Sequence, residues 1–207
     1  MKTTYSLPVY QIALTYLPKV GPVKGKELAS LYPNLPDIFR LATYQPFAAE
    51  ALLEAEKTVQ ICAEDQIQIL YFEDPDYPQR IKDVYDAPLI LFKKGKADLN
   101  AHRIVAVVGT RHASDVGKKV TEELVQSAIK DEVILVSGFA RGIDIALHKA
   151  CLKYNVPTIA VLAGGFRHIY PQENAMYVKQ ILANGALLSE YAPHIPPAAY
   201  YFPVRNR

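Results

Sequence analysis

The chain has 207 residues, of which 50% are hydrophobic and 21% are charged, and its net charge is +2. Such a length can bury a sizeable core in one or two domains, and the composition is ordinary for a soluble globular protein. The charge is uneven, because residues 1–100 carry 11 basic and 13 acidic side chains, whereas residues 101–207 carry 12 and 8. The basic second half is suggestive of a phosphate-bearing ligand.

The sequence predicts a cytoplasmic protein with no membrane segment and no cofactor. It contains no run of about 18 apolar residues, and only Lys2 precedes the first mixed segment, so neither a membrane helix nor a signal peptide is predicted. Cys62 and Cys151 lie far apart without a C-x-x-C pattern, which is typical of buried thiols in a reducing compartment. The five histidines lack metal-ligand spacing, so we expect no metal site.

Residues 1–65 are predicted to form a small helical domain. Residues 9–17 and 22–32 place apolar side chains at helical spacing, and residues 47–64 are rich in strong helix formers. The turn LPKVGPVKGKEL is similar to a helix-hairpin-helix motif, in which a glycine-rich turn contacts DNA phosphates, although Lys19 replaces the usual first glycine. Two roles stay open for this turn, namely contact with DNA and packing between helices.

Residues 66–207 are predicted to form an α/β domain with a Rossmann-like parallel sheet. After two lead-in strands, IQILYF and LILFKKG, four apolar strands alternate with helices. Strands that are apolar throughout are typical of a parallel sheet with helices on both faces. The four strands are expected in RIVAVVGTR, EVILVSG, PTIAVLAGG and ALLSEY, and the helices in residues 116–129, 143–155 and 173–185.

Each of these four strands ends in residues that can bind an anion. In an open parallel sheet, ligands bind beyond the carboxyl ends of the strands, and backbone N–H groups, hydroxyls and guanidiniums are the groups that hold phosphate. The glycines could equally serve tight turns and close helix packing. The residues are, in strand order, Gly109, Thr110 and Arg111; Ser137, Gly138, Arg141 and Gly142; Gly164, Gly165 and Arg167; and Ser189 and Glu190.

Two acidic residues near these strand ends have structural interpretations. Asp144 is expected to cap the following helix or to interact favourably with its dipole. Glu190 could be a lone general base, but no histidine, cysteine or second carboxylate is placed beside it by the motifs. We therefore expect Glu190 to contact the arginines.

A nicotinamide cofactor and a nucleoside triphosphate both conflict with the sequence. The fingerprint G-x-G-x-x-G should follow the first strand, where the sequence reads GTRHAS, and no acidic ribose-binding residue follows the second strand. A G-x-x-x-x-G-K-[ST] loop is also missing. Hydride transfer and ATP hydrolysis are therefore disfavoured.

Several segments, taken in order, resemble the motifs of the DNA-processing protein A (DprA/Smf) family. They are FEDPDYPQRIKDVYDAPLILFKKG, VVGTRHAS, VSGFARGIDIALHKACL, AVLAGGFRHIYPQEN, LLSEY and the terminal YFPVRNR. The helical segment at the front is similar to that family's sterile-alpha-motif or helix-hairpin-helix-like domain. The resemblance implies a non-enzymatic protein of natural transformation that binds and protects incoming single-stranded DNA, loads the RecA recombinase and forms a homodimer.

The resemblance also implies a set of phosphate-pocket residues. The position of Arg167 varies within the family, and Phe139 occupies a place where a small residue is frequent. In the family the terminal motif runs on into a further helix and strands, so residues 66–207 are expected to be a domain shortened at its C-terminus. The implied residues are Gly109, Thr110, Arg111, Ser137, Gly138, Arg141, Gly142, Arg205, Asn206 and Arg207.

Two alternatives remain. The first is a Rossmann-like nucleotide hydrolase related to the lysine-decarboxylase-like phosphoribohydrolases, whose P-G-G-x-G-T-x-x-E motif is missing here. The second is a pure protein-interaction scaffold, which would leave the arginines without a role. The aromatic residues near the strand ends could stack on DNA bases or pack a proline-rich loop. These residues are Tyr170, Tyr191, Tyr200, Tyr201 and Phe202.

Overall fold

The computed structural model describes residues 5–207 and divides the chain into two compact units, Met1–Leu91 and Phe92–Arg207. The division falls inside strand β2 (Ile90–Gly95), whereas the sequence predicts a domain boundary at residues 65 and 66. The domain boundary between residues 65 and 66 therefore remains a prediction. None of the described helices is both long and apolar enough to cross a membrane.

The first unit is mainly helical, as expected from its sequence. Its elements are α1 (Leu7–Tyr16), α2 (Pro22–Leu31), η1 (Leu35–Arg40), α3 (Gln45–Glu64), β1 (Gln68–Tyr71) and α4 (Gln79–Lys82). Helices α1 and α3 pack together around buried Ile12, Leu14 and Ala55, and the Tyr16 hydroxyl lies 3.0 Å from Thr58 Oγ1. The helices α1, α2 and α3 each have proline in the first two positions, where no hydrogen bond of its nitrogen is lost.

The turn between α1 and α2 has a residue in the left-handed conformation at the position of the motif's first glycine. Lys19 has φ +60°, a conformation that glycine adopts most easily. Gly21 then forms the N-cap of α2 in an extended conformation. The turn therefore accommodates lysine where the helix-hairpin-helix motif carries glycine, and a DNA contact at this turn stays a prediction.

A six-stranded sheet has the order β1-β2-β6-β5-β4-β3, which confirms the predicted α/β class. The neighbours β3–β4, β4–β5 and β5–β6 are parallel, whereas β2 pairs antiparallel with β6. The carboxyl ends of β3, β4, β5 and β6 therefore meet at one edge. The elements of the second unit after β2 are β3 (Ile104–Ala106), α5 (Asp115–Ala128), η2 (Ile129–Asp131), β4 (Ile134–Ser137), α6 (Ile143–Lys153), β5 (Thr158–Val161), η3 (Gln172–Tyr177), α7 (Val178–Asn184), β6 (Ala186–Ser189) and α8 (Tyr201–Arg205).

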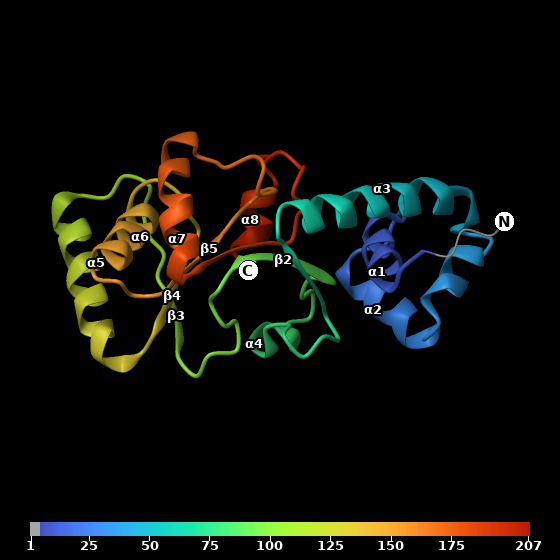
Figure 1. Cartoon of the computed structure of the whole chain (residues 1–207), viewed down its shortest axis with the longest axis horizontal. Coiled ribbons are helices and arrows are strands. Elements are labelled where there is room, and N and C mark those ends of the chain that lie inside the picture. The colour runs from blue at the N-terminus through green and yellow to red at the C-terminus, as the bar shows by residue number, and fades with distance from the viewer. Residues whose placement is uncertain (1–4) are drawn as a thin grey trace. The chain divides into compact units, whose positions relative to one another are not determined.

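The core of the second unit has two apolar clusters. One joins α5 and α6 to β4 through Val125, Leu147 and Leu135, and Figure 1 shows α5 and α6 next to each other. The other joins α7 to β5 and β6 through Ile181, Ala160 and Leu187. Strands with buried side chains on both sides explain the continuous apolar runs in the sequence.

Two elements differ from the predicted ones. The first strand of the alternating set ends at Ala106, because only one further backbone bond, Val107 N to Val136 O, continues its pairing. The expected helix over residues 173–185 is divided into η3 and α7. Asn174 explains the position of η3, because its buried side chain donates to Phe139 O at 2.9 Å.

Strand β3 is an edge strand, and apolar side chains are exposed on it and on α5. Val105 on β3 is 46% exposed, and Val116 and Val120 on α5 are 72% and 56% exposed. Val116 and Val120 are four residues apart and therefore share one face of α5.

Candidate anion-binding site

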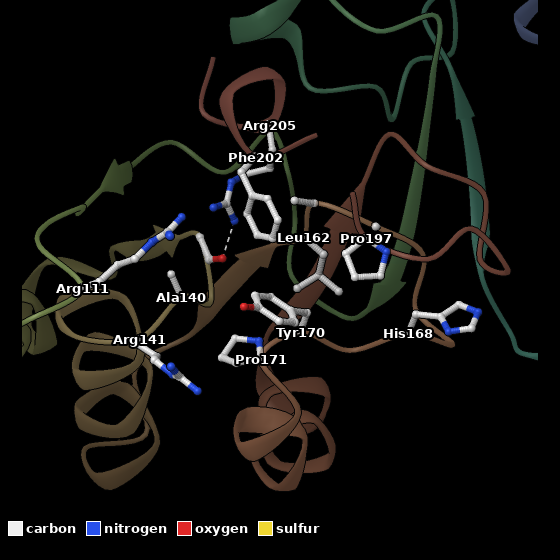
Figure 2. Close-up of a pocket in the computed structure, with 13 residues that line it drawn as sticks. Arg111, Ala140, Arg141, Leu162, His168, Tyr170, Pro171, Pro197, Phe202 and Arg205 are labelled. Carbon is white, nitrogen blue, oxygen red and sulfur yellow. Dashed lines mark hydrogen bonds between the residues drawn. The ribbon is translucent and has the colours of Figure 1, made fainter. Parts of the chain in front are cut away.

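A pocket lies at the carboxyl edge of the sheet in the second unit, and three arginines line it (Figure 2). Arg111 follows β3, Arg141 follows β4 and Arg205 ends α8. Leu162 and the aromatic rings of Tyr170 and Phe202 form part of the remaining lining. The pocket thus offers positive charge next to apolar and aromatic surface.

Arg205 is half-buried and is held by the ends of two strands. Its Nη1 donates to the carbonyls of Gly138 and Val161, the latter at 2.5 Å. Burial lowers the pKa of Arg205, and the nearby Asp144 carboxylate opposes that change. A guanidinium still remains charged at neutral pH, so Arg205 places a fixed positive charge at the edge of the sheet.

Gly138 is required by this arrangement. A Cβ at Gly138 would lie 2.6 Å from Arg205 Nη1 and 2.7 Å from Asp144 Oδ2. The absence of a side chain therefore allows Arg205 to approach both the backbone and Asp144. Of the two roles expected for Asp144, capping is not found, because Gly142 is the N-cap of α6 and no side chain caps it. The other expected role, a favourable interaction with the helix dipole, agrees with the place of Asp144 in the first turn. Asp144 lies buried there, and its carboxylate accepts from Ala140 N at 3.4 Å.

Arg111 is the most accessible of the three arginines to a ligand. It is exposed, and its guanidinium carbon lies 5.7 Å from the centroid of the Phe202 ring, a cation–π distance. Within residues 5–207, its guanidinium takes part in no hydrogen bond or ion pair. All of its donors are therefore available to an anion.

Arg141 is bound to a carboxylate at the edge of the pocket. Its Nε donates to Glu173 Oε1 at 2.7 Å and its Nη2 donates to Glu173 Oε2 at 2.9 Å. The hydrogen bonds of this pair raise the pKa of Arg141 and lower the pKa of Glu173. Figure 2 shows the Arg141 side chain directed away from Arg111 and Arg205.

The predicted glycines after β3 and β4 bring their two loops into contact. Gly142 has φ +80°, and a Cβ there would collide with the carbonyl of Thr110. The same carbonyl accepts from Ile143 N at 3.1 Å, and Gly109 packs against the Ile143 side chain. These glycines therefore serve close packing, which was one of the two roles expected for them.

Other predicted site residues lie outside the pocket lining or turn inward. Ser137 is buried and its hydroxyl donates to Val107 O at 2.7 Å. Gly164 lines the pocket, but the N–H of Gly165 donates to Ile195 O. Arg167 is exposed, and its backbone N–H donates to Pro193 O. We therefore place the pocket chiefly at the ends of β4 and β5.

The terminal motif contributes differently at each position. Arg205 lines the pocket, and Asn206 Oδ1 accepts from Arg205 Nε at 3.0 Å. Arg207 Nη2 lies 2.6 Å from Glu190 Oε2. This ion pair confirms the expectation that Glu190 contacts an arginine.

Sequence reasoning missed the role of Glu173. The residue lies 32 positions after Arg141, and no local pattern connects them. The apolar lining from Leu162, Pro171 and Pro197 was also not predicted. Among the described residues, no group of three or more histidine, cysteine or acidic side chains is placed to hold a metal ion.

The fold and the pocket define the chain as a Rossmann-like α/β protein with a basic site at the carboxyl edge of its sheet. The model of the DNA recombination-mediator protein A family matches residues 68–207. The chain belongs to this family, which confirms the resemblance found in the sequence motifs.

Individual relatives agree with this membership. The chain is 34% identical to DNA processing protein DprA of Bacillus subtilis over 97% of this chain and 61% of the relative. It is 42% identical to DNA processing protein DprA of Streptococcus pneumoniae over 65% of this chain and 47% of the relative. The chain thus spans about half to three fifths of the length of these two relatives.

Two solved structures have the same fold. DNA processing protein A from Streptococcus pneumoniae superposes with a TM-score of 0.77 and 29% identity, covering 100% of this chain and 74% of that chain. DNA processing protein A from Helicobacter pylori superposes with a TM-score of 0.60 and 30% identity, covering 68% of this chain and 63% of that chain. A single-stranded DNA binding mode has been described for the Helicobacter pylori protein.

Proposed function

We propose that this protein binds single-stranded DNA and holds a backbone phosphate in the pocket of Arg111, Arg141 and Arg205. The observation that carries the proposal is that these three arginines line one pocket together with Tyr170 and Phe202. The family membership and the single-stranded DNA binding described for the Helicobacter pylori relative support it. We further propose that this binding protects incoming DNA during natural transformation.

The chemistry of the pocket suits a single strand better than a duplex. Guanidiniums bind phosphate through charge-assisted hydrogen bonds, and aromatic faces accept bases only when those bases are unpaired. Phosphate contacts position a strand without reading its sequence. We therefore expect binding that depends little on sequence and prefers single-stranded over double-stranded DNA.

We propose that the protein acts without catalysis. Among the residues that the structure describes, the pocket is lined by arginines, glycines and apolar residues together with His168 and Tyr170, and no carboxylate is in this lining. Glu190, the one general base considered from the sequence, is paired with Arg207. Release of base from a nucleoside monophosphate, lost in Glu190→Gln, would instead support the phosphoribohydrolase-like alternative.

The partners are also proposals. The family description as a recombination mediator supports RecA recombinase as a partner. An assay of RecA loading onto single-stranded DNA that is already bound by this protein would test this partner. The exposed apolar residues of β3 and α5 support a homodimer. A homodimer would be excluded if sedimentation equilibrium showed a monomer at all concentrations. A cytoplasmic location is consistent with both partners and would be contradicted by secretion of the protein.

Substitution of Arg111 tests the DNA proposal directly. We expect Arg111→Ala to weaken binding of an oligothymidylate about tenfold, because one charge-assisted contact is lost. The slope of log K against log salt should also fall by about 0.7, since one fewer counterion is released from the single strand. Fluorescence anisotropy at several salt concentrations measures both quantities, and duplex DNA in the same assay should bind less well.

Arg103→Ala is the matched control for this experiment. Arg103 is exposed and precedes β3, so it lies at the opposite end of that strand from Arg111. Both variants lose one positive charge, and long-range electrostatic effects are therefore similar. Equal affinities and salt slopes in the two variants would show that the pocket is not the DNA site.

A further inference from the structure

Glu173 forms an ion pair with Arg141, one of the three arginines of the pocket. It approaches Arg141 side-on and accepts from both Nε and Nη2, at 2.7 and 2.9 Å. Such a paired contact is the geometry in which a carboxylate or a phosphate binds arginine most strongly. A phosphate that used the same edge of Arg141 would have to displace Glu173.

The carboxylate is held near Arg141 by its neighbour in the chain. Asn174 is 4% exposed and its Nδ2 donates to Phe139 O at 2.9 Å. Phe139 itself is fully buried and belongs to the loop that carries Arg141. The buried contact thus fixes η3 against this loop and keeps Glu173 within reach of Arg141.

The ion pair is nevertheless weak enough to be broken by a ligand. The side chains of Arg141 and Glu173 are 63% and 55% exposed, and water and salt screen the attraction of exposed pairs. While the pair persists, Glu173 neutralises Arg141 and repels any phosphate at the edge of the pocket. Figure 2 shows that Arg141 is then directed away from the other two arginines.

We propose that Glu173 is an affinity-determining latch, which holds Arg141 away from the anion site until a phosphate of the DNA strand displaces the carboxylate. This inference rests on the proposed function, because the displacing ligand is the strand that the pocket would bind. Arg111 and Arg205 make the first contact, and Arg141 joins them after Glu173 is released. Glu173 therefore lowers the affinity of the pocket for single-stranded DNA.

Glu173→Gln should strengthen binding, because it removes the negative charge and keeps the shape of the side chain. We expect an affinity for oligothymidylate about three to ten times higher at low salt, because no carboxylate has to be displaced from Arg141. The salt slope should stay close to that of the wild type, since both complexes neutralise the same phosphates once Arg141 has joined the site. Fluorescence anisotropy across a salt series gives both values. A weaker affinity would overturn the proposal and make Glu173 a residue that positions Arg141 for the ligand.

Glu122→Gln provides a control with the same change in charge. Glu122 on α5 pairs with Lys153 at 2.7 Å, and neither residue lines the pocket. We expect this variant to bind DNA within about twofold of the wild type, with an unchanged salt slope. A gain equal to that of Glu173→Gln would mean that net charge alone explains the effect, and the proposal would fail.

A double-mutant cycle with Arg141→Ala distinguishes an effect of Glu173 that acts through Arg141 from direct repulsion between Glu173 and the DNA. If Glu173 acts through Arg141, Glu173→Gln should raise affinity in the wild-type background and leave Arg141→Ala at the level set by the Glu122→Gln control. An equal gain in both backgrounds would overturn the proposal. Circular dichroism confirms that all variants are folded before their affinities are compared.

Thermal stabilisation by inorganic phosphate distinguishes failure of the latch from failure of the proposed function. Phosphate should raise the Tm of Glu173→Gln more than the Tm of the wild type, because a ligand of the folded state stabilises it according to its affinity. This result without any DNA binding would sustain the latch and reject the DNA proposal. If DNA binding is weakened by Arg111→Ala but unchanged by Glu173→Gln, the proposed role of Glu173 is wrong and the DNA-binding proposal stands. If phosphate leaves the Tm unchanged and DNA does not bind, both proposals are wrong.

Discussion

Three arginines reach one pocket, but their surroundings give them different tasks. Arg205 is anchored on the carbonyls of Gly138 and Val161 and connects α8 to the ends of β4 and β5. The guanidinium donors of Arg111 make no hydrogen bond within residues 5–207 and are available to a ligand. Its guanidinium lies over the Phe202 ring. Arg141 is bound to Glu173. Substitution of Arg205 should therefore affect folding as well as binding, and Arg111 is the better probe of function.

The aromatic residues of this region also divide into two groups. Tyr191 and Tyr201 lie against each other with ring centroids 3.8 Å apart, and a hydrogen bond with Tyr200 is the main reason that the pKa of Tyr201 is raised to about 12. Their rings are used in packing. Tyr170 is 56% exposed and lines the pocket, and its ring centroid lies 5.6 Å from that of Phe202 in a T-shaped arrangement. Its exposure leaves the Tyr170 ring accessible to a base.

Tyr170→Trp would report base stacking, because the chain contains no tryptophan. We expect oligothymidylate to quench the fluorescence of this single tryptophan, since a base stacked on the ring changes its excited state. An abasic oligonucleotide of the same length should quench it much less. Fluorescence titration measures both ligands.

Tyr154→Trp serves as the control in that titration. Tyr154 follows the last residue of α6, at the end of the helix away from Arg141, and its hydroxyl contacts Glu122. We expect little quenching of Trp at this position by either oligonucleotide. Equal quenching at positions 154 and 170 would contradict a base-stacking role for Tyr170.

At the scale of elements, the loop between β4 and α6 carries most of the site. It includes Gly138 and Arg141, and it ends at Gly142, whose φ of +80° is unfavourable for any residue with a side chain. The loop contacts the end of β3 through the carbonyl of Thr110. The relative position of Arg111 and Arg141 therefore depends on Gly142.

Gly142→Ala should destabilise the protein and weaken binding together. The added methyl group would collide with the Thr110 carbonyl and require a left-handed alanine, which we expect to lower the free energy of unfolding by about 2 kcal/mol or more. Urea unfolding followed by circular dichroism measures the change. Affinity for single-stranded DNA should fall in the same variant, because the two loops separate.

Gly117→Ala is the matched substitution in α5. A Cβ there would lie 3.5 Å from its nearest neighbours, Ile143 Cδ1 and Ser114 Oγ, which is an ordinary contact. Alanine should therefore raise the free energy of unfolding by up to about 1 kcal/mol through its higher helix propensity. If both variants changed stability in the same direction, the steric role assigned to Gly142 would be incorrect.

At the scale of the whole molecule, we propose that residues 66–207 form a domain that folds by itself. The two compact units meet at Leu91 and Phe92, but a chain cut there would begin within β2. Phe92–Gly95 pair with residues 186–189 of β6. A cut at residue 65 leaves β1 and β2 complete.

Two fragments test this domain boundary. We expect residues 66–207 to unfold cooperatively with a higher Tm than residues 92–207, because the shorter fragment loses β1 and the first residues of β2. Thermal unfolding followed by circular dichroism compares them. Equal Tm values would place the domain boundary at residue 92 instead.

The order and type of the main elements of the second unit can be predicted from the amino-acid sequence. Apolar runs such as ILVS over Ile134–Ser137 predict buried parallel strands, because both faces of such strands are covered. Glycines and arginines at the strand ends predict an anion site, because parallel strands place their carboxyl ends at one edge. These inferences depend on local patterns, which the sequence displays directly.

The contacts of each side chain, in contrast, are seen only in the folded chain. Arg141 and Glu173 are 32 residues apart, and Arg205 meets Gly138 across 67 residues. Likewise, the division of the expected helix at residues 173–185 accompanies the contact of Asn174 with Phe139. Such pairs arise from the packing of elements that are distant in sequence. Their partners follow from the fold as a whole, and no local periodicity or spacing specifies them.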